Sequence, residues 1–455
     1  MTNKNILTYG SKVSAIEQVY FSPVVVVPPL IDVPLGTTYC FLSKVEPWPN
    51  DVDPPAPTQD QISIKKVFKN IFAAKLIHSN DISPVIERRD WLTGTVYDYY
   101  RDDVDMFEQD INGKQVLNYY VKNRFDQVFK CLWNVNGSPS TIEPYFEPGS
   151  YGTNNIFKGV DGYKWKYIYT IDTGSKVKFM DTSWIPVPVG QSTPNPLIST
   201  AGCGNIDVIN VLDGGSNYDP SNAVVSIVIT GDGQGASATP IVVDGVITEV
   251  IVTNAGNNYT QATATVTSTL GTGATLISPT SPVGGHGFDP VSEFGCNHVM
   301  FSTEFSGSED GILPTDIDFH QVGLVVNPTT KELSPNPANG AIYKTTTDFV
   351  VAPGFGSYIN DEQIYQGTSI ENAAFIGTVL SFDQASNVIR VLNTTGTPIT
   401  NAPVFGNSSK TVRTLLSYSN PNFVLFSGYI SFIENRTGIQ RSADGIEQIK
   451  IVLGY

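Results

Sequence analysis

Four consecutive charged residues stand next to a tryptophan in the stretch VIERRDW, where Glu87, Arg88, Arg89 and Asp90 precede Trp91. Only 15% of the chain is charged, so this cluster is unusual for the sequence. Adjacent arginines and carboxylates can form a buried or interface ion-pair network, and the tryptophan ring can cover it. In an extended chain the two arginines point to opposite sides, so each would reach a different carboxylate or carbonyl. Catalysis would require a nucleophile or an acid with a raised pKa close by, and the sequence indicates neither.

A second group of residues has the donor atoms of a metal site. The stretch GCNH places Cys296 two residues before His298, and His286 lies upstream. A structural zinc site needs four ligands, which usually come as two close pairs, and the sequence has no second pair. We therefore expect these side chains to lie in the core without a metal ion.

Two further stretches resemble ligand-binding loops only superficially. The acidic stretch 97–110 has Glu108 where an EF-hand calcium loop that begins at Asp103 needs glycine. The stretch GDGQGA lacks the Lys-Ser/Thr ending of a phosphate-binding loop. We expect a solvated acidic loop at the first stretch and a turn between strands at the second, and we predict no cofactor.

The composition limits the classes of partner. A chain of 455 residues suggests about three domains. Its formal net charge of −16 disfavours nucleic acid and anionic membranes as partners. The 40 glycines and 30 prolines favour strands and turns over helical bundles. The first residues show no signal-peptide pattern, so we expect a soluble protein used without export. The four cysteines are too scattered for a disulfide framework; they are Cys40, Cys131, Cys203 and Cys296.

The elements that would position these residues are mostly strands. Residues 37–48 predict a strand that ends at prolines, followed by a proline-rich connection. Residues 161–171 predict a strand entered from an Asp-Gly turn, with aromatic side chains on one side and Lys164 and Lys166 on the other. Between them, at about 60–78, we predict one amphipathic helix from apolar residues at helical spacing; these are Ile64, Phe68, Ile71, Phe72 and Leu76. A final strand is predicted at Ile446, Ile449, Ile451 and Leu453.

Two stretches have a residue pattern different from that of the rest of the chain, and each predicts an inserted all-β unit. Within 197–282 the sequence repeats at a spacing of 41 positions; Ile206 matches Ile247, Gly215 matches Gly256, and Tyr218 matches Tyr259. This indicates a β unit in two copies, with glycines at turns and one tyrosine anchoring each copy. Residues 355–417 contain short strands at nearly even spacing, which predict a small barrel or sandwich.

The order of the remaining motifs carries a family resemblance. EPWP at 46–49 is followed by VIERRDW, by DGYKW at 161–165, by GGHGFDPVSEFG and DFHQVGLVVNP, and finally by ENR and EQIKIVL. This succession resembles the baseplate wedge subunit encoded by gene eight of T-even-type contractile-tailed bacteriophages. The resemblance covers roughly 30–196, 283–350 and 418–455, and the two β inserts have no counterpart in it.

The resemblance implies a mainly β protein, with a β-sandwich core and smaller α+β parts. It implies core segments at 1–196, 283–354 and 418–455, interrupted by the inserts at 197–282 and 355–417. It also implies a homodimer that packs against other wedge subunits in the virion tail baseplate, assembled in the host cytoplasm, with no enzymatic activity, metal or cofactor. The motif residues then become candidates for structural or interface roles; they are Glu46, Trp48, Arg88, Arg89, Asp90, Trp91, Asp161, Trp165, His286, Asp289, Glu434, Asn435 and Arg436.

Two other classes of function stay open at this point. A carbohydrate-binding or adhesin module is suggested by the β inserts, if their tyrosines and asparagines are exposed. A tail-associated hydrolase or lyase that degrades polysaccharides would need a cleft with clustered carboxylates.

Overall fold

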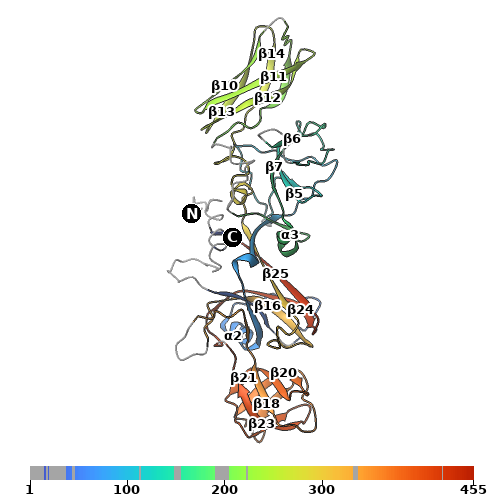
Figure 1. The fold of residues 1–455 in the computed structure, drawn as a ribbon, viewed down its shortest axis with the longest axis vertical. Helices are drawn as coiled ribbons and strands as arrows, with labels where there is room; N and C mark the ends of the chain where they lie inside the picture. The colour runs from blue at the N-terminus through green and yellow to red at the C-terminus, as the bar shows by residue number, and fades with distance from the viewer. Residues whose placement is uncertain are drawn as a thin grey trace. The chain divides into compact units, whose positions relative to one another are not determined.

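The chain is mainly β, with 45% of it in strands and 7% in helices, arranged in several antiparallel sheets and one six-stranded barrel. This confirms the predicted fold class. A computed structural model describes residues 15–16, 19, 37–43, 47–111, 114–147, 155–189, 204–221, 224–330, 337–422 and 424–455. No helix in this described part is long and apolar enough to cross a membrane. The chain divides into two compact units, each of which is built from segments distant in sequence (Figure 1).

The first unit is built mainly from Ser83–Met300, with Val452–Tyr455. Its four-stranded antiparallel sheet has the order β4-β5-β7-β6; the strands are β4 (Tyr120–Lys122), β5 (Gln127–Trp133), β6 (Ile156–Lys158) and β7 (Lys164–Thr170). The predicted strand at 161–171 is confirmed as β7, and Gly162 provides its turn with a φ of 86°. Both faces of β7 are buried, so its lysines lie in the interior as well as its aromatic residues.

Shorter elements complete this part of the first unit. Strand β3 (Ile82–Glu87), which follows the 3₁₀ turn η1 (Ser79–Asp81), pairs antiparallel with β8 (Trp184–Pro186). Helix α3 (Thr173–Phe179) begins after Asp172, whose carboxylate accepts a bond from the Ser175 amide. The short helix α4 is Pro290–Glu293. The stretch 97–110 forms no helix or strand, and Asp102–Asp105 are exposed, as predicted for an acidic loop.

The repeat forms three two-stranded antiparallel sheets around one core (Figure 1). The sheets are β9 (Asn210–Ser216) with β14 (Thr272–Ile277), β10 (Val225–Gly231) with β13 (Ala262–Ser268), and β11 (Gln234–Val243) with β12 (Val246–Asn257). Tyr218 and Tyr259 occupy equivalent places: the amide of Ala274 donates to the Tyr218 hydroxyl, and that of Ala236 to Tyr259. Both tyrosines are buried in this core, as predicted for residues that anchor the two copies, so they do not meet the condition of exposed tyrosines that the adhesin alternative sets.

The second unit contains a five-stranded antiparallel sheet in the order β17-β2-β1-β16-β24. Its strands are β1 (Thr38–Ser43), β2 (Ile71–Leu76), β16 (Ile317–Val326), β17 (Ile342–Lys344) and β24 (Tyr429–Arg441). Helix α2 (Gln61–Asn70) packs on this sheet through Val67 and Phe68.

The predicted helix at 60–78 is wrong beyond Asn70. Ile71 already has an extended backbone, with φ −63° and ψ 128°, and it opens strand β2. This strand lies between β1 and β17, and Ile71, Phe72 and Ala74 are fully buried there. Short apolar runs fit a buried strand as well as a helix face, and the pairing with two neighbours decides between them.

A closed barrel of six strands follows in the second unit, in the order β18-β21-β20-β19-β22-β23 (Figure 1). The strands are β18 (Thr347–Val351), β19 (Gln363–Gln366), β20 (Phe375–Asp383), β21 (Val388–Gly396), β22 (Pro403–Gly406) and β23 (Val412–Ser419). The barrel therefore begins before residue 355, because β18 closes it by pairing with both β21 and β23. Its core includes Tyr358, which is buried like the repeat tyrosines.

The two remaining strands include positions where the chain passes from one unit to the other. They are β15 (His298–Ser306) and β25 (Ile446–Gly454). Strand β25 confirms the final strand predicted from the apolar residues between Ile446 and Leu453.

Candidate functional site

The charged cluster at the end of β3 is a set of partly buried ion pairs. Arg89 donates to the Glu87 carboxylate at 3.1 Å and to the carbonyl oxygens of Gln115 and Leu117. Its side chain is only 12% exposed, and its guanidinium lies 5.0 Å from the centre of the Tyr120 ring. Arg89 thus pairs with the last residue of β3 and ties this end of the strand to the segment before β4 through two backbone acceptors.

Arg88 reaches a different set of acceptors, as the sequence predicts. It donates to the Asp90 carboxylate at 2.9 Å and to the Asp181 carbonyl at 2.9 Å. Asp90 is also paired with the buried Lys122, whose Nζ lies 3.1 Å from its other oxygen. Arg88, Arg89 and Asp90 are therefore each engaged with another segment, and Glu87 is paired within the cluster.

The expectation that Trp91 covers these ion pairs is wrong, because the ring over Arg89 is Tyr120. Trp91 packs instead against the aromatic core of the β4-β5-β7-β6 sheet. Its indole Nε1 donates to the Ser140 hydroxyl at 3.1 Å, and that hydroxyl donates to Asp161 at 3.3 Å. Asp161 also accepts from the backbone amides of Thr141 and Ile142. Two motifs that are distant in sequence are thus joined through one hydroxyl.

Trp165, the tryptophan of the DGYKW motif that begins at Asp161, is fully buried in the same aromatic core. It stacks on Tyr163 with ring centres 5.6 Å apart and meets Tyr97 edge-on at 5.2 Å. Its position is that of a core residue.

A buried charged triad lies at the segment that contains His286 and Asp289. Glu293 is 2.6 Å from His286 Nδ1 and 3.1 Å from Lys130 Nζ, and all three side chains are at most 3% exposed. Burial alone would raise the pKa of Glu293, but Lys130 and His286 outweigh it and lower that pKa to about 2. Burial, together with Lys130, lowers the pKa of His286. Asp289 caps α4 by accepting from two of its amides.

The sequence analysis missed Glu293 and Lys130. A signal existed for Lys130, because it interrupts the apolar run of β5, where a lysine needs a buried partner. Glu293 gave no comparable signal, since it follows a polar stretch of the chain.

The structure gives the three suspected metal ligands separate surroundings. His286 pairs with Glu293, whereas His298 lies against Trp184 and within 2.6 Å of the Asn297 side-chain oxygen. Cys296 is a buried thiol whose pKa burial raises well above its ordinary value. Among the residues that the structure describes, no three His, Cys, Asp or Glu side chains are grouped to hold a metal ion.

In the second unit, the first and last motifs of the family resemblance meet. The Trp48 indole donates to the Arg436 carbonyl at 2.8 Å, and the Asn435 side chain donates to the Pro55 carbonyl at 2.8 Å. Arg436 forms a bidentate pair with Glu434, with both distances 3.0 Å. Glu46, the remaining candidate of this motif, lies outside the described residues. The loop after Trp48 is therefore fastened to β24 at two points.

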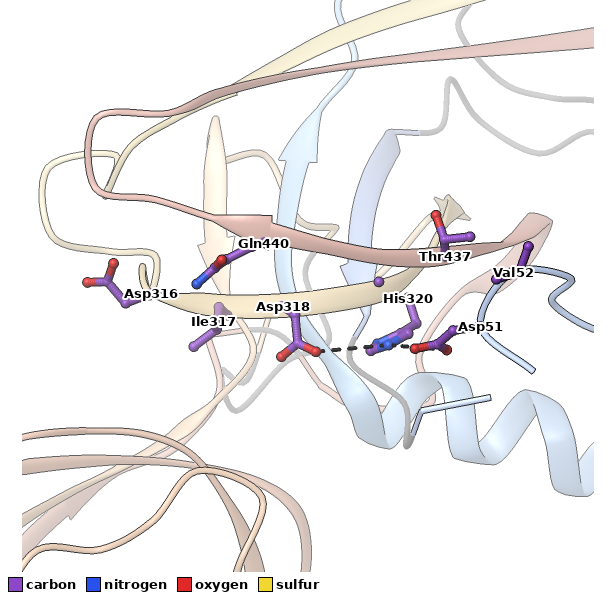
Figure 2. A pocket seen from close by; sticks show the side chains of 9 residues that line it. Asp51, Val52, Asp316, Ile317, Asp318, His320, Thr437 and Gln440 are labelled. Carbon is purple, nitrogen blue, oxygen red and sulfur yellow. Dashed lines mark ion pairs between the residues drawn. The ribbon is translucent and has the colours of Figure 1, made fainter. Parts of the chain in front are cut away.

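Next to this joint is a groove of about 650 Å³ between the loop, β16 and β24. We call it the acidic groove; the lining side chains that matter here are Asp51, Asp316, Asp318, His320, Thr437 and Gln440. Figure 2 shows the His320 imidazole between the carboxylates of Asp51 and Asp318, each of which has an oxygen 3.9 Å from Nε2. The sequence analysis did not single out this site. Its signal was the alternate spacing of Asp318 and His320, which places their side chains on one face of β16.

The described residues therefore contain two structural joints, one buried charged triad and one open acidic groove. No model of a known protein family matches this sequence, and no curated protein sequence matches it.

Proposed function

We propose that this chain is a structural subunit of a contractile phage tail baseplate wedge. In this role it pairs with a second copy of itself and bridges other wedge subunits during baseplate assembly. The proposal begins from the order of the motifs along the sequence, which resembles that of the family.

One structural observation carries the proposal further: the motifs that make the resemblance meet each other as joints. Trp48 binds the Arg436 carbonyl across 388 positions of sequence, and Trp91 reaches Asp161 through Ser140. Indole N–H groups and carboxylates that are bonded to backbone and hydroxyl groups hold segments in place. A structural subunit requires motif residues that fasten distant segments to each other in this way, because its segments must keep their relative positions when force acts on the assembly.

The adhesin alternative is weakened by the same kind of observation. It depends on exposed aromatic residues in the β inserts. Tyr218, Tyr259 and Tyr358 are all buried, whereas Phe355 in the second insert is exposed. Aromatic rings that stack on sugars must present an open face. These three tyrosines serve the cores of their units.

Immunoelectron microscopy tests the proposal. Antibodies raised against the purified chain should label the end of the tail farthest from the head in particles released by cells that carry the gene. Labelling confined to fibres or to material outside particles would contradict a baseplate role. Light scattering of the purified chain should also give about twice the 49.3 kDa chain mass, because the proposed subunit is a dimer.

An activity assay separates the enzymatic alternative. The acidic groove is a cleft with clustered carboxylates, which are the residues that a polysaccharide hydrolase uses. We expect the purified chain to release no reducing ends from host-surface polysaccharide. Release that is lost in Asp318→Asn would replace the structural assignment with an enzymatic one.

A further inference from the structure

The acidic groove owes its shape to an irregularity in the pairing of β16 with β24. Phe319 lies opposite Ile439, and Gln321 lies opposite Asn435. Three residues of β24, 436–438, therefore face the single residue His320. Such a bulge bends the strand away from its partner and re-aims side chains, and bulges are common beside binding sites.

Gly438 allows the imidazole to lie beneath the bent strand. A Cβ atom at this position would lie 2.9 Å from His320 Nε2, closer than real side chains approach. The His320 imidazole thus forms the bottom of the groove, and any residue larger than glycine at 438 would displace it.

His320 has an unsatisfied polar atom at the bottom of the groove. Its side chain is 2% exposed, and its buried Nδ1 has no hydrogen-bond partner. The carboxylate oxygens of Asp51 and Asp318 lie 3.9 Å from Nε2, beyond the length of a hydrogen bond. Nδ1 is closed off from solvent, so the ring nitrogen that a ligand in the groove meets is Nε2, which lies between the two carboxylates without a hydrogen bond to either. A donor group that enters between the carboxylates can therefore bond to them and to Nε2.

The charge of the groove indicates the sign of that ligand. Three of its lining residues are aspartates, and none is lysine or arginine. The wall that carries Asp51 is already fixed, because Trp48 and Pro55 are fastened to β24 on either side of it. A preorganised site of this kind loses little entropy when a cation enters.

We propose that the acidic groove binds the guanidinium group of an arginine side chain on a partner protein. A guanidinium is planar and has five donors, so it can bond to carboxylates on both sides of the imidazole and still donate to a ring nitrogen. The ammonium of lysine is compact and strongly hydrated, and it cannot span these acceptors. A bound metal ion is disfavoured, because the described residues offer no group of three ligands. The inference does not depend on the proposed baseplate role.

Histidine NMR on the full chain tests the inference, because the sequence has only four histidines. The probe is argininamide, and the signals are the ring Cε1–H resonances of 13C-labelled histidine. We expect one resonance, identified by its absence in His320→Gln, to shift and saturate with argininamide. Citrullinamide, which is uncharged and has nearly the same shape, should leave it unchanged. Lysinamide should bind at least about tenfold more weakly.

Two variants remove the site in different ways. The double variant Asp51→Asn/Asp318→Asn should raise the dissociation constant of argininamide at least about tenfold, because it removes both charges. Gly438→Ala should have the same effect by filling the hollow without changing a charge. Asp53→Asn, two residues from Asp51 and exposed, is the matched control and should bind like the wild type.

The two aspartates are 51% and 43% exposed, so their variants should keep the wild-type circular dichroism spectrum. Wild-type affinity in the folded double variant would overturn the inference. So would an equal response to lysinamide, no response of His320 to argininamide, or a saturable response to zinc or calcium chloride in place of it.

Discussion

Trp91 and Asp161 are held together by a single hydroxyl group. Ser140 Oγ accepts from the Trp91 indole at 3.1 Å and donates to the Asp161 carboxylate at 3.3 Å. Ser140 is fully buried, so water cannot easily replace it as the link between the two motifs.

Ser140→Ala should lower the free energy of unfolding by about 1–3 kcal/mol, because it leaves the indole N–H of the half-buried Trp91 without its acceptor. Urea denaturation followed by tryptophan fluorescence measures this change. The matched control is Ser138→Ala, at an exposed position in the same loop, which should stay within about 0.5 kcal/mol of the wild type. Equal effects of the two substitutions would mean that the bridge contributes nothing.

Arg89→Ala should cost about 3 kcal/mol of unfolding free energy, since it strands the Glu87 carboxylate and two carbonyl oxygens in a site where the arginine is 12% exposed. Arg89→Lys should recover only part of this loss, because an ammonium cannot reproduce the planar guanidinium that reaches Glu87 and the two carbonyl oxygens together.

Arg101→Ala is the control for this prediction. Arg101 pairs with Asp103 at 2.7 Å, but the two side chains are 42% and 63% exposed. Removal of such a surface pair should cost less than about 1 kcal/mol. If Arg89→Ala proves equally mild in denaturant melts, the cluster is a solvated loop and not a joint.

The buried triad predicts a loss of stability in weak acid. The pKa of His286 is lowered in the folded chain, so the unfolded chain binds the proton first as the pH falls below about 6.5. Stability contributed by this group is therefore present above that pH and is lost as the pH falls through the lowered pKa, with a slope of up to about 1.4 kcal/mol per pH unit.

His286→Gln should flatten the dependence of unfolding free energy on pH just below about 6.5. Glu293 does not share this window, because its pKa is lowered to about 2 and its contribution is lost from about 4.5 downward. Urea midpoints across the range measure the slope, and an unchanged slope in the variant would assign it to other groups.

Lys164 predicts a pH dependence of the same sign in weak base. Burial lowers its pKa to about 8, and its ammonium has only long contacts, at 3.4 Å to the Ile209 carbonyl and 3.5 Å to Asn210. The unfolded chain holds this proton up to about 10.4, so the stability of the wild type should rise as the pH increases from about 8.

Lys164→Met should therefore stabilise the protein by about 1–3 kcal/mol near neutral pH, and the gain should shrink above about 8. Lys158→Met, where the lysine is 49% exposed, should change stability by less than about 1 kcal/mol. A destabilised Lys164→Met protein would mean that the contacts to Ile209 and Asn210 outweigh the desolvation of the charge.

Strand patterns were the part of the fold that the sequence predicted well. The Asp-Gly turn before Tyr163 and the run that follows it became β7, and the spacing of 41 positions placed Tyr218 and Tyr259 at equivalent sites. Turn residues and internal repeats are local sequence patterns. They therefore predict structure correctly even when the distant segments that pair with them are unknown.

The failures have a common cause, which is dependence on distant parts of the chain. Ile71 and Phe72 fit a helix until β1 and β17 are known to flank them. The acidic groove requires Asp51 to lie beside His320, which is 269 positions away in the sequence. Glu293 becomes a candidate site residue only because Lys130 lies next to it in the fold. No local pattern encodes such pairings.

The closure of the six-stranded barrel has one more consequence. Every strand of that barrel has a hydrogen-bonded neighbour on both sides, whereas an open sheet presents an edge onto which another chain can add a strand. A protein crowded among identical copies risks fibrous polymerisation through such edges. A closed barrel has no free edge, so it can contact neighbouring molecules only through its side chains. Its contacts therefore depend on the residues at its surface and not on backbone hydrogen bonds between strands.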